Sequence, residues 1–419
     1  MPYFFCISRK SACWCLYLLP VFFLFSCANK QDAEITDKYS ELYINNKSVK
    51  DTVDVSKMVD SVKVLKLTDA LHKSLSRIDQ LYTLGDYYIA IDAVHTKRVN
   101  AYDANGNYVK TLIEDGPAKT DALNVTDCYV NEKNEVIIYD YAQMKLFVFD
   151  ANLASKKSIK SGILFNYNHI ASLPGTDNFV GYSSYYGYNA HLQNEDNSPS
   201  CLDIMGNDLS LVKKHLIYPP KFNDITLITL PKSFFPFKDS LRFFRAFDSY
   251  IYSLNKNEIE RRYKILYAEG NFPPDFLGEI INPHLNDFQN IGRNLSSFQA
   301  LHLYFKGYTC PASWLETDNI IYLSSITFSE KKTNNINSVI LKKGKTPEVI
   351  TAKVFAENSR FKLAFPNFNT YDKKKNEFIT YCSGNKLKKY LYKDSPLIRP
   401  ADIVDDSFYL IKVKFKRKQ

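Results

Sequence analysis

The stretch that decides the fold is "YYIAIDAVHTKRVNAYDANGNYVKTL" (Tyr87–Leu112), which aligns by eye with "EVIIYDYAQMKLFVFDANLASKKSI" (Glu135–Ile159). Each copy has an apolar run that ends in Asp, a short polar link, a second apolar run that ends in Asp, a turn and a third strand. The first aspartates of the two copies, Asp92 and Asp140, are 48 residues apart. A period of roughly 40–50 residues with several strands per unit is typical of β-propeller blades.

Looser copies of the second strand of this unit follow along the chain. They are "NFVGYSSYYGY" from Asn178, "SYIYSLN" from Ser249, "NIIYLSSITF" from Asn319 and "NEFITYCSG" from Asn376. The count predicts an all-β fold, a six-bladed β-propeller with four antiparallel strands per blade. Thirty Tyr and 29 Phe against 14 Gly favour the same β-rich core. Two inserts, 219–240 and 271–298, are too long for tight turns and are expected to form short helices and loops on one face.

Two strands lack a partner in their own neighbourhood. They are "VKVLKL" at 62–67 and "FYLIKVKF" at 408–415, and both alternate apolar and polar residues as half-buried strands do. A ring of blades has no free edge only when the two chain ends meet. We therefore expect these strands to pair antiparallel as the outer two strands of the sixth blade.

The amino terminus reads as a targeting segment. Arg9 and Lys10 precede an almost wholly apolar run at 12–25, which as a helix spans about 21 Å and falls short of the roughly 30 Å hydrocarbon core. The run ends in "LFSC" at 24–27, which resembles the bacterial lipobox despite the bulky Phe25. That resemblance implies cleavage before Cys27 and acylation of its thiol and new amine. The alternative is an ordinary signal peptide with an accidental cysteine.

The predicted domain boundaries follow from cleavage before Cys27. Residues 1–26 form the signal peptide, 27–58 a tether and linker, and 59–419 the propeller. Several acyl chains on one cysteine give a stable membrane anchor. The predicted membrane contact is therefore this N-terminal lipid, with a monomeric propeller domain held at the surface.

Charge and cysteine usage narrow the function classes. The formal net charge is +9, and cleavage of the signal leaves +7, which is too mild to predict a nucleic-acid partner. The four cysteines of the mature chain, none in a CxxC pair, are Cys128, Cys201, Cys310 and Cys382. Cys128 and Cys382 lie in apolar strands and are expected to be buried. The seven histidines show no metal-ligand spacing, so no metal or other cofactor is predicted.

A family resemblance rests on "SVKVLKLTDALHKSLSRIDQLYTLGDYYIAIDAVHTKRVNAYDANGNYVKTLIEDGP" (Ser61–Pro117). It resembles the start of the six-bladed, NHL-like β-propeller lipoproteins of Gram-negative gut bacteria. The loop "EDGPAKTDAL" keeps Gly116-Pro117 but lacks the Gly-Glu that follows in that family. The resemblance implies a six-bladed propeller located in the cell envelope, anchored in the outer membrane on its periplasmic or surface face. The family has no settled chemistry to transfer.

Ligand-binding candidates come from the loops that join the second and third strands of the first three blades. They are His95, Lys97, Arg98, Gln143, Lys145, Tyr185, Tyr186, Tyr188 and His191. Aromatic faces stack on sugars, and cations bind carboxylates. The alternative is a wet loop surface with no ligand.

No catalytic residue is assigned. Asp92 and Asp140 are either paired carboxylates for acid–base work or strand-ending acceptors for backbone N–H groups, and the second interpretation is favoured. Asp103 and Asp150 lie in "DANG" and "DANL" turns and read as structural.

Two functions stay open. The first is a binding module for a glycan, a peptide or an envelope protein. The second is a propeller enzyme such as a polysaccharide lyase or a lactone or glycoside hydrolase. An enzyme needs ionisable groups close together at the channel mouth, whereas a binding module needs only aromatic groups and hydrogen-bond donors. The sequence has neither a Gly-x-Ser-x-Gly elbow nor a phosphate loop, which favours binding.

Overall fold

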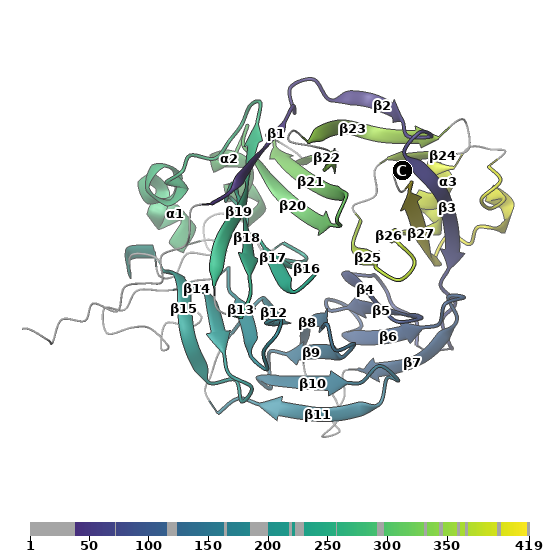
Figure 1. The fold of residues 1–419 in the computed structure, drawn as a ribbon, viewed down its shortest axis with the longest axis horizontal. Coiled ribbons are helices and arrows are strands. Elements are labelled where there is room, and N and C mark those ends of the chain that lie inside the picture. Colours follow the sequence, from purple (N-terminus) through teal and green to yellow (C-terminus); the bar gives the residue numbers. More distant parts are fainter. Residues whose placement is uncertain are drawn as a thin grey trace, which may run out of the picture. The chain divides into compact units, whose positions relative to one another are not determined.

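The computed structural model shows six sheets arranged as the blades of a propeller, which confirms the predicted fold class (Figure 1). It describes residues 38–416 except for 72, 115–123, 163–165, 185–199, 218–219, 223–229, 257, 291–296, 331–332, 343–346, 358–360, 365–367 and 392–394. Within these ranges, no helix has the length and apolar character needed to cross a membrane.

The first three blades are built from consecutive strands, the innermost first. Blade one is β4 (Gln80–Leu84), β5 (Tyr87–Asp92), β6 (Arg98–Tyr102) and β7 (Tyr108–Ile113). Blade two is β8 (Val125–Val130), β9 (Val136–Asp140), β10 (Lys145–Phe149) and β11 (Ser155–Lys160). Blade three is β12 (His169–Ser172), β13 (Phe179–Tyr182), β14 (Ser200–Met205) and β15 (Leu211–Ile217).

The last three blades each recruit a strand from the amino-terminal part of the chain. Blade four is β16 (Phe234–Phe237), β17 (Ser240–Phe243), β18 (Tyr250–Leu254) and β19 (Ile259–Tyr267), with β1 (Ser40–Ile44) added. Blade five is β20 (Thr309–Glu316), β21 (Ile320–Phe328), β22 (Thr333–Leu341) and β23 (Glu348–Glu357), with β2 (Lys50–Asp54) and β24 (Phe361–Ala364) on β23. Blade six is β25 (Thr370–Asp372), β26 (Glu377–Ser383), β27 (Phe408–Phe415) and β3 (Val59–Lys66).

The ring closes as predicted. Strand β27 pairs antiparallel with β3, with Val413 opposite Val62, so β3 is the outermost strand of blade six. The end of β3 also rests on the β6–β7 turn, where Gly106 has a φ of +82°. A Cβ at Gly106 would lie 2.1 Å from the carbonyl oxygen of Lys66, so this close approach requires glycine.

The range 27–58, expected as a tether and linker, contains two strands of the propeller rim. Strands β1 and β2, here called the N-terminal belt, pair parallel with β19 and β23, the last strands of blades four and five (Figure 1). In β1, Leu42 and Ile44 are buried while their neighbours are exposed. This alternation lets a five-residue strand complete an existing sheet, because one face packs inward and the backbone joins a ready edge.

The aspartates that end the repeated strands have the structural role favoured from sequence. Asp92 Oδ1 accepts the backbone N–H of His95 at 2.8 Å, and Asp140 Oδ1 accepts that of Gln143 at 3.0 Å. Asp103 and Asp150 accept backbone N–H groups within their own turns. These bonds fix the hairpin bends.

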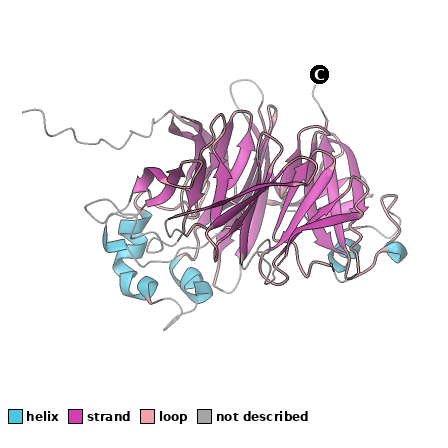
Figure 2. Ribbon diagram, turned by 90° about the horizontal axis from the view of Figure 1, so that it is seen from below, coloured by secondary structure: helices cyan, strands magenta, loops and turns pink. Residues whose placement is uncertain are grey.

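The two ends of the propeller differ in the connections that lie there. In each blade, the turns between strands one and two and between strands three and four lie at one end, here called the cavity face. The turns between strands two and three and the links between blades lie at the other end, the loop face. The described helices all lie in connections of the loop face and gather on one side in Figure 2. They are α1 (Leu285–Gln289), α2 (Ser297–Tyr304), α3 (Gly384–Tyr390) and single turns at Pro220–Phe222, Leu277–Ile281, Asn282–His284 and Pro400–Asp402.

The range 219–240, expected to be only helices and loops, contains more than that. It holds β16, and β17 begins at its last residue, so these strands supply the inner hairpin of blade four. The segment from Ser249 therefore forms the third strand of that blade, β18, rather than the second as expected. The weak alternation of "SFFPF" hides this inner strand.

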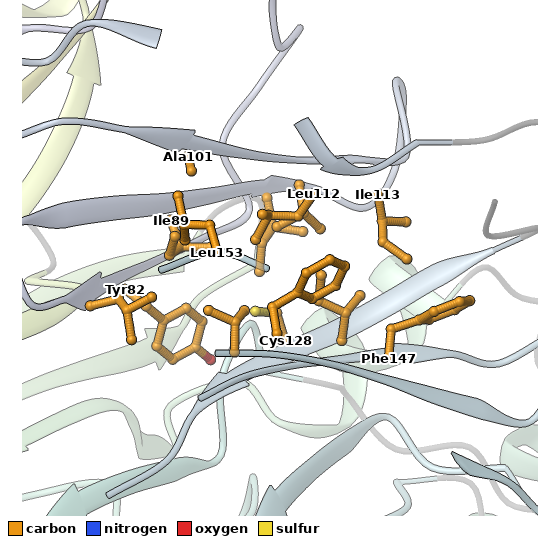
Figure 3. Packing of buried hydrophobic residues seen from close by; sticks show 14 of the residues in the cluster. Tyr82, Ile89, Ala101, Leu112, Ile113, Cys128, Phe147 and Leu153 are labelled. Carbon is orange, nitrogen blue, oxygen red and sulfur yellow. The ribbon is translucent and has the colours of Figure 1, made fainter. Parts of the chain in front are cut away.

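Apolar side chains fill the space between neighbouring blades. Figure 3 shows the cluster between blades one and two, in which Ile89 and Leu112 pack toward Cys128 and Phe147. The four cysteines of the described chain are buried, as expected for Cys128 and Cys382. Burial raises the pKa of the Cys201 thiol to about 12, which makes it unreactive at neutral pH.

Candidate functional site

The candidates predicted from sequence lie on the loop face as far as they are described. His95 and Lys97 lie in the β5–β6 turn and Gln143 lies in the β9–β10 turn, while Arg98 and Lys145 are the first residues of β6 and β10. Because strands two and three lie away from the channel axis, these turns do not converge on the channel. Tyr185, Tyr186, Tyr188 and His191 lie outside the described residues.

Three of these side chains already have local partners. Gln143 Nε2 donates to Asp140 Oδ2 at 3.0 Å, and Arg98 Nε lies 3.4 Å from Glu114 Oε2. The Lys145 ammonium lies 4.3 Å from the centre of the Phe147 ring. These contacts order the turns, and the structure brings the candidates together only within each blade.

A cavity of about 650 Å³ lies on the opposite, cavity face. Side chains from all six blades line it, mostly from the turns that join the first and second strands. Described members of this lining are Tyr82, Gly85, Asp86, Tyr87, Tyr129, Asn131, Glu132, Asn134, Ala151, Pro174, Lys232, Pro236, Lys238, Ser240, Glu316, Thr370, Tyr371, Asp372, Lys373 and Lys374. The innermost hairpins converge here because they are the ones nearest the axis.

The lining mixes aromatic rings with charges of both signs. Four tyrosines contribute, together with carboxylates, lysines and amides. At the rim, Lys374 Nζ lies 3.4 Å from Asp86 Oδ1, so blade six is ion-paired to blade one. The hydrogen bond and charge of Lys374 hold the pKa of the Asp86 carboxyl below its usual range.

One lysine lies inside the channel. Lys232 lines both the large cavity and a second one of about 60 Å³. The small cavity lies deeper, because it borders Gln80 and Leu81 whereas the large one borders the end of the same strand, Tyr82 to Leu84.

The backbone before Lys232 is held by two buried side chains of other blades. His169 Nε2 lies 2.7 Å from the carbonyl oxygen of Leu230, and Gln80 Nε2 donates to the carbonyl oxygen of Pro231 at 2.8 Å. Both side chains also contact Asp127 Oδ1, His169 through Nδ1 at 3.2 Å and Gln80 through Nε2 at 2.6 Å. This network fixes where the lysine stem starts.

The surroundings of the Lys232 ammonium are mostly aromatic. Its Nζ lies 3.9 Å from the centre of the Tyr82 ring and 5.5 Å from that of Phe235. The ammonium donates a long hydrogen bond of 3.4 Å to the carbonyl oxygen of Asn369. Burial lowers the pKa of Lys232 to about 7, although the charge of Asp127 acts in the opposite direction.

A buried ion network supports the cavity wall between blades four and five. Glu316 receives Arg242 Nε at 2.5 Å on one oxygen, and Lys342 Nζ at 2.5 Å and the Tyr263 hydroxyl at 2.7 Å on the other. Burial alone would raise the pKa of Glu316, but Arg242 and Lys342 lower it below the ordinary value. A carboxylate satisfied in this way serves the structure rather than a ligand. In the part of the chain that the structure describes, no group of three His, Cys, Asp or Glu side chains is placed to hold a metal ion.

Lys232 is not among the candidates predicted from sequence, because it lies in the range 219–240, which is expected to form short helices and loops on one face. The signal that points to it is "LPKSFFPF" (Leu230–Phe237), in which a lysine directly precedes an aromatic strand. Its place in the channel depends on Gln80, Asp127 and His169, which are far away in sequence.

Fold and cavity together define a six-bladed β-propeller with a ligand-sized chamber on its axis. The profile of the family DUF5128, described as 6-bladed beta-propeller, matches residues 30–304, and the chain belongs to this family. A search of curated proteins gave no match.

Comparison with solved structures gives matches at low sequence identity. A "putative exported protein" from Bacteroides fragilis NCTC 9343 is 13% identical with a TM-score of 0.64, over 91% of this chain and 100% of that one. A member of the DUF4221 family from Bacteroides vulgatus is 10% identical with a TM-score of 0.42, over 86% and 98%. A streptogramin B lyase is 8% identical with a TM-score of 0.39, over 87% and 100%. The likeness to the Bacteroides fragilis protein, at 13% identity, concerns the fold alone.

Proposed function

We propose that this chain is a ligand-binding module of the cell envelope and that a glycan occupies the central cavity. The observation that carries the proposal is the cavity of about 650 Å³ to which all six blades contribute. Small-molecule sites typically measure roughly 300–1,000 Å³ and are largely pre-formed. A chamber built from six rigid hairpins meets both conditions.

The lining chemistry favours a hydroxyl-rich ligand. Sugar rings present apolar faces that stack on aromatic side chains, and their hydroxyl groups donate to carboxylates and amides. Tyr87 and Tyr371 supply aromatic surface, while Glu132 and Asn134 supply exposed polar groups from blade two. An apolar ligand would leave these polar groups unpaired.

The lipid anchor at Cys27 is part of the proposal. The lipobox-like sequence supports it, and export of the Bacteroides fragilis protein with the same fold, as its name states, is consistent with it. The N-terminal belt begins at Ser40, 13 residues after Cys27. The anchor would thus lead directly into the rim of blade four.

The binding test compares the two faces of one molecule. The mature domain is screened on a glycan array, and the best ligand is titrated by calorimetry. We expect Glu132→Ala combined with Lys373→Ala, two exposed positions at the cavity rim, to weaken binding by about tenfold or more, roughly 1.4 kcal/mol. Lys213→Ala, on the outer strand β15, serves as the control and should bind like the unmodified domain.

A variant on the loop face tests the alternative binding site. His95→Ala combined with Lys97→Ala should leave the affinity unchanged if the cavity is the site. Loss of binding in this variant alone would move the site to the candidates predicted from sequence. New reducing or unsaturated chain ends in the glycan would indicate an enzyme instead.

The anchor is tested separately. Cys27→Ala should abolish labelling by a fatty-acid probe and leave the precursor uncleaved by the lipoprotein peptidase. Unchanged labelling would contradict the anchor without affecting the cavity.

A further inference from the structure

We propose that Lys232 is a nucleophilic amine and that the central cavity holds a ligand with an aldehyde or ketone group as an imine on this side chain. The inference rests on the proposed function in one respect, namely that the central cavity is the ligand site. It adds the chemical class of the ligand and the atom that bonds to it.

The first argument is position. Lys232 lines the large cavity and also separates it from the small cavity deeper in the channel. A ligand that enters from the cavity face therefore meets this side chain at the bottom of the chamber. Lys238, Lys373 and Lys374 also line the cavity, but they are exposed at its rim.

The second argument is how the side chain is held. The carbonyl groups of Leu230 and Pro231 receive His169 and Gln80, so the residues before the lysine are fixed to blades one and three. The ammonium nitrogen then lies over the Tyr82 ring. A group pre-positioned in this way loses little further freedom when it reacts.

The third argument is the lack of a close counter-ion. Within the described residues, no carboxylate oxygen lies within ion-pair distance of Lys232 Nζ. Asp127, whose charge acts on Lys232, already binds Gln80 and His169 through Oδ1 and the backbone N–H of Ile170 through Oδ2. By contrast, Lys238 is paired with Asp318 at 2.6 Å and Lys374 with Asp86 at 3.4 Å.

The charge state of the amine agrees with these contacts. The titratable groups around it are Tyr82 on β4 and Asp127 and Cys128 on β8. The attraction of Asp127 favours the ammonium, but burial outweighs it and lowers the pKa of Lys232 to about 7. Roughly half of the amine is then neutral at neutral pH, whereas an ordinary lysine is almost entirely protonated.

The chemistry balances without a further reactant. The nitrogen of the neutral amine attacks the carbonyl carbon, and a C–N bond forms. The carbonyl oxygen leaves with the two amine hydrogens as one water molecule, which gives a C=N double bond. No oxidation or reduction occurs, and the imine is reversible in water.

The test is competitive labelling of the lysines in the folded mature domain. Formaldehyde at limiting concentration with cyanoborohydride methylates neutral amines, and peptide mass spectrometry reports the rate at each lysine from about pH 6 to about pH 10. We expect Lys232 to react at least about tenfold faster than Lys238 and Lys374 at neutral pH. Its rate should level off above a midpoint near pH 7, whereas theirs should keep rising.

A second measurement tests the imine itself. Pyridoxal followed by borohydride should add one label at Lys232, the label should be absent in Lys232→Met, and it should persist in the matched variant Lys238→Met. If Lys232 reacts no faster than the two rim lysines, or pyridoxal labels all of them equally, the inference is overturned. A domain that binds a glycan but has an unreactive Lys232 would support the proposed function and contradict this inference. A reactive Lys232 in a domain that binds no glycan would support this inference and contradict the proposed function.

Discussion

The cavity face and the loop face are made by the same strands, yet they differ in how they are built. On the cavity face, two-residue turns such as Gly85-Asp86 and Lys238-Asp239 bring six inner hairpins together around one chamber. On the loop face, short turns alternate with long connections, which carry every helix that the structure describes (Figure 2). The inner hairpins of the cavity face, rather than the long connections of the loop face, therefore build the chamber.

The largest expected difference between the faces concerns buried charge. Glu316→Gln leaves Arg242 and Lys342 without their carboxylate beneath the cavity wall, and removal of one member of a buried pair typically costs about 3–5 kcal/mol. Urea unfolding of the mature domain measures this loss. The matched variant is Glu330→Gln on the loop face, whose exposed partner is Lys306. It should unfold like the parent domain, and an equal loss in both variants would contradict the distinction.

The next effect is a pH dependence of the free energy of unfolding, which Lys232 in the central cavity causes. The folded-state pKa of Lys232 is lowered to about 7, whereas the unfolded chain keeps the ordinary value near 10.5. Between these values the unfolded state binds more protons, so stability rises with pH, and below about pH 7 the full cost of the buried charge is present. Lys232→Met should therefore unfold at higher urea concentration at neutral pH, by on the order of 2 kcal/mol.

In the parent domain the free energy of unfolding should rise with pH, and this slope should disappear in Lys232→Met. A parent domain without the slope, or a Lys232→Met variant that keeps it, would contradict this expectation. Lys238→Met provides the control, since Lys238 lies on the same cavity but is exposed and ion-paired with Asp318. It should keep the slope of the parent.

A smaller effect compares one glycine on each face. Gly106→Ala in the β6–β7 turn should cost more than Gly307→Ala in the link before β20, although φ is positive at both, +82° and +87°. A Cβ at Gly106 would lie 2.1 Å from the carbonyl oxygen of Lys66, whereas at Gly307 it meets nothing within 4 Å. We expect the two melting temperatures to differ by roughly 1–3 °C, which corresponds to about 1–2 kcal/mol for a clash that forces the backbone to shift. Equal losses would show that the contact with β3 yields freely.

The smallest effect concerns one aspartate, Asp140, that accepts hydrogen bonds within a hairpin turn of the loop face. Asp140→Ala removes the acceptor for the backbone N–H of Gln143 and for its side-chain amide, and it should cost about 1 kcal/mol in thermal unfolding. Asp150→Ala, in the exposed turn of the same blade, offers a comparison on the cavity face. Because both aspartates bind their own turns, glycan affinity should not change in either variant.

The sequence predicted the features that repeat or alternate, and missed those that have no such pattern of their own. The Asp92 and Asp140 hairpins and the pairing of β3 with β27 follow from local patterns of apolar and polar residues. The N-terminal belt was missed because "SELYI" and "KDTVD" are too short to predict a strand, and their partners β19 and β23 lie more than 200 residues away. The open face could not be predicted either, because every blade has turns at both ends. Which end holds the chamber depends on side chains that six separate blades bring together.

The N-terminal belt and β3 together constrain the order in which the molecule can fold. Strands β1, β2 and β3 emerge first during synthesis, but Val62 finds its partner Val413 only 351 residues later. Blades one to three consist of local hairpins and can form as their residues appear, while blade six stays incomplete until the last strand is present. The leading segment must therefore wait, extended and unpaired, until β19, β23 and β27 arrive in turn. A chain tethered near its start would meet this delay while held at a surface, where its open edges are exposed to neighbouring chains.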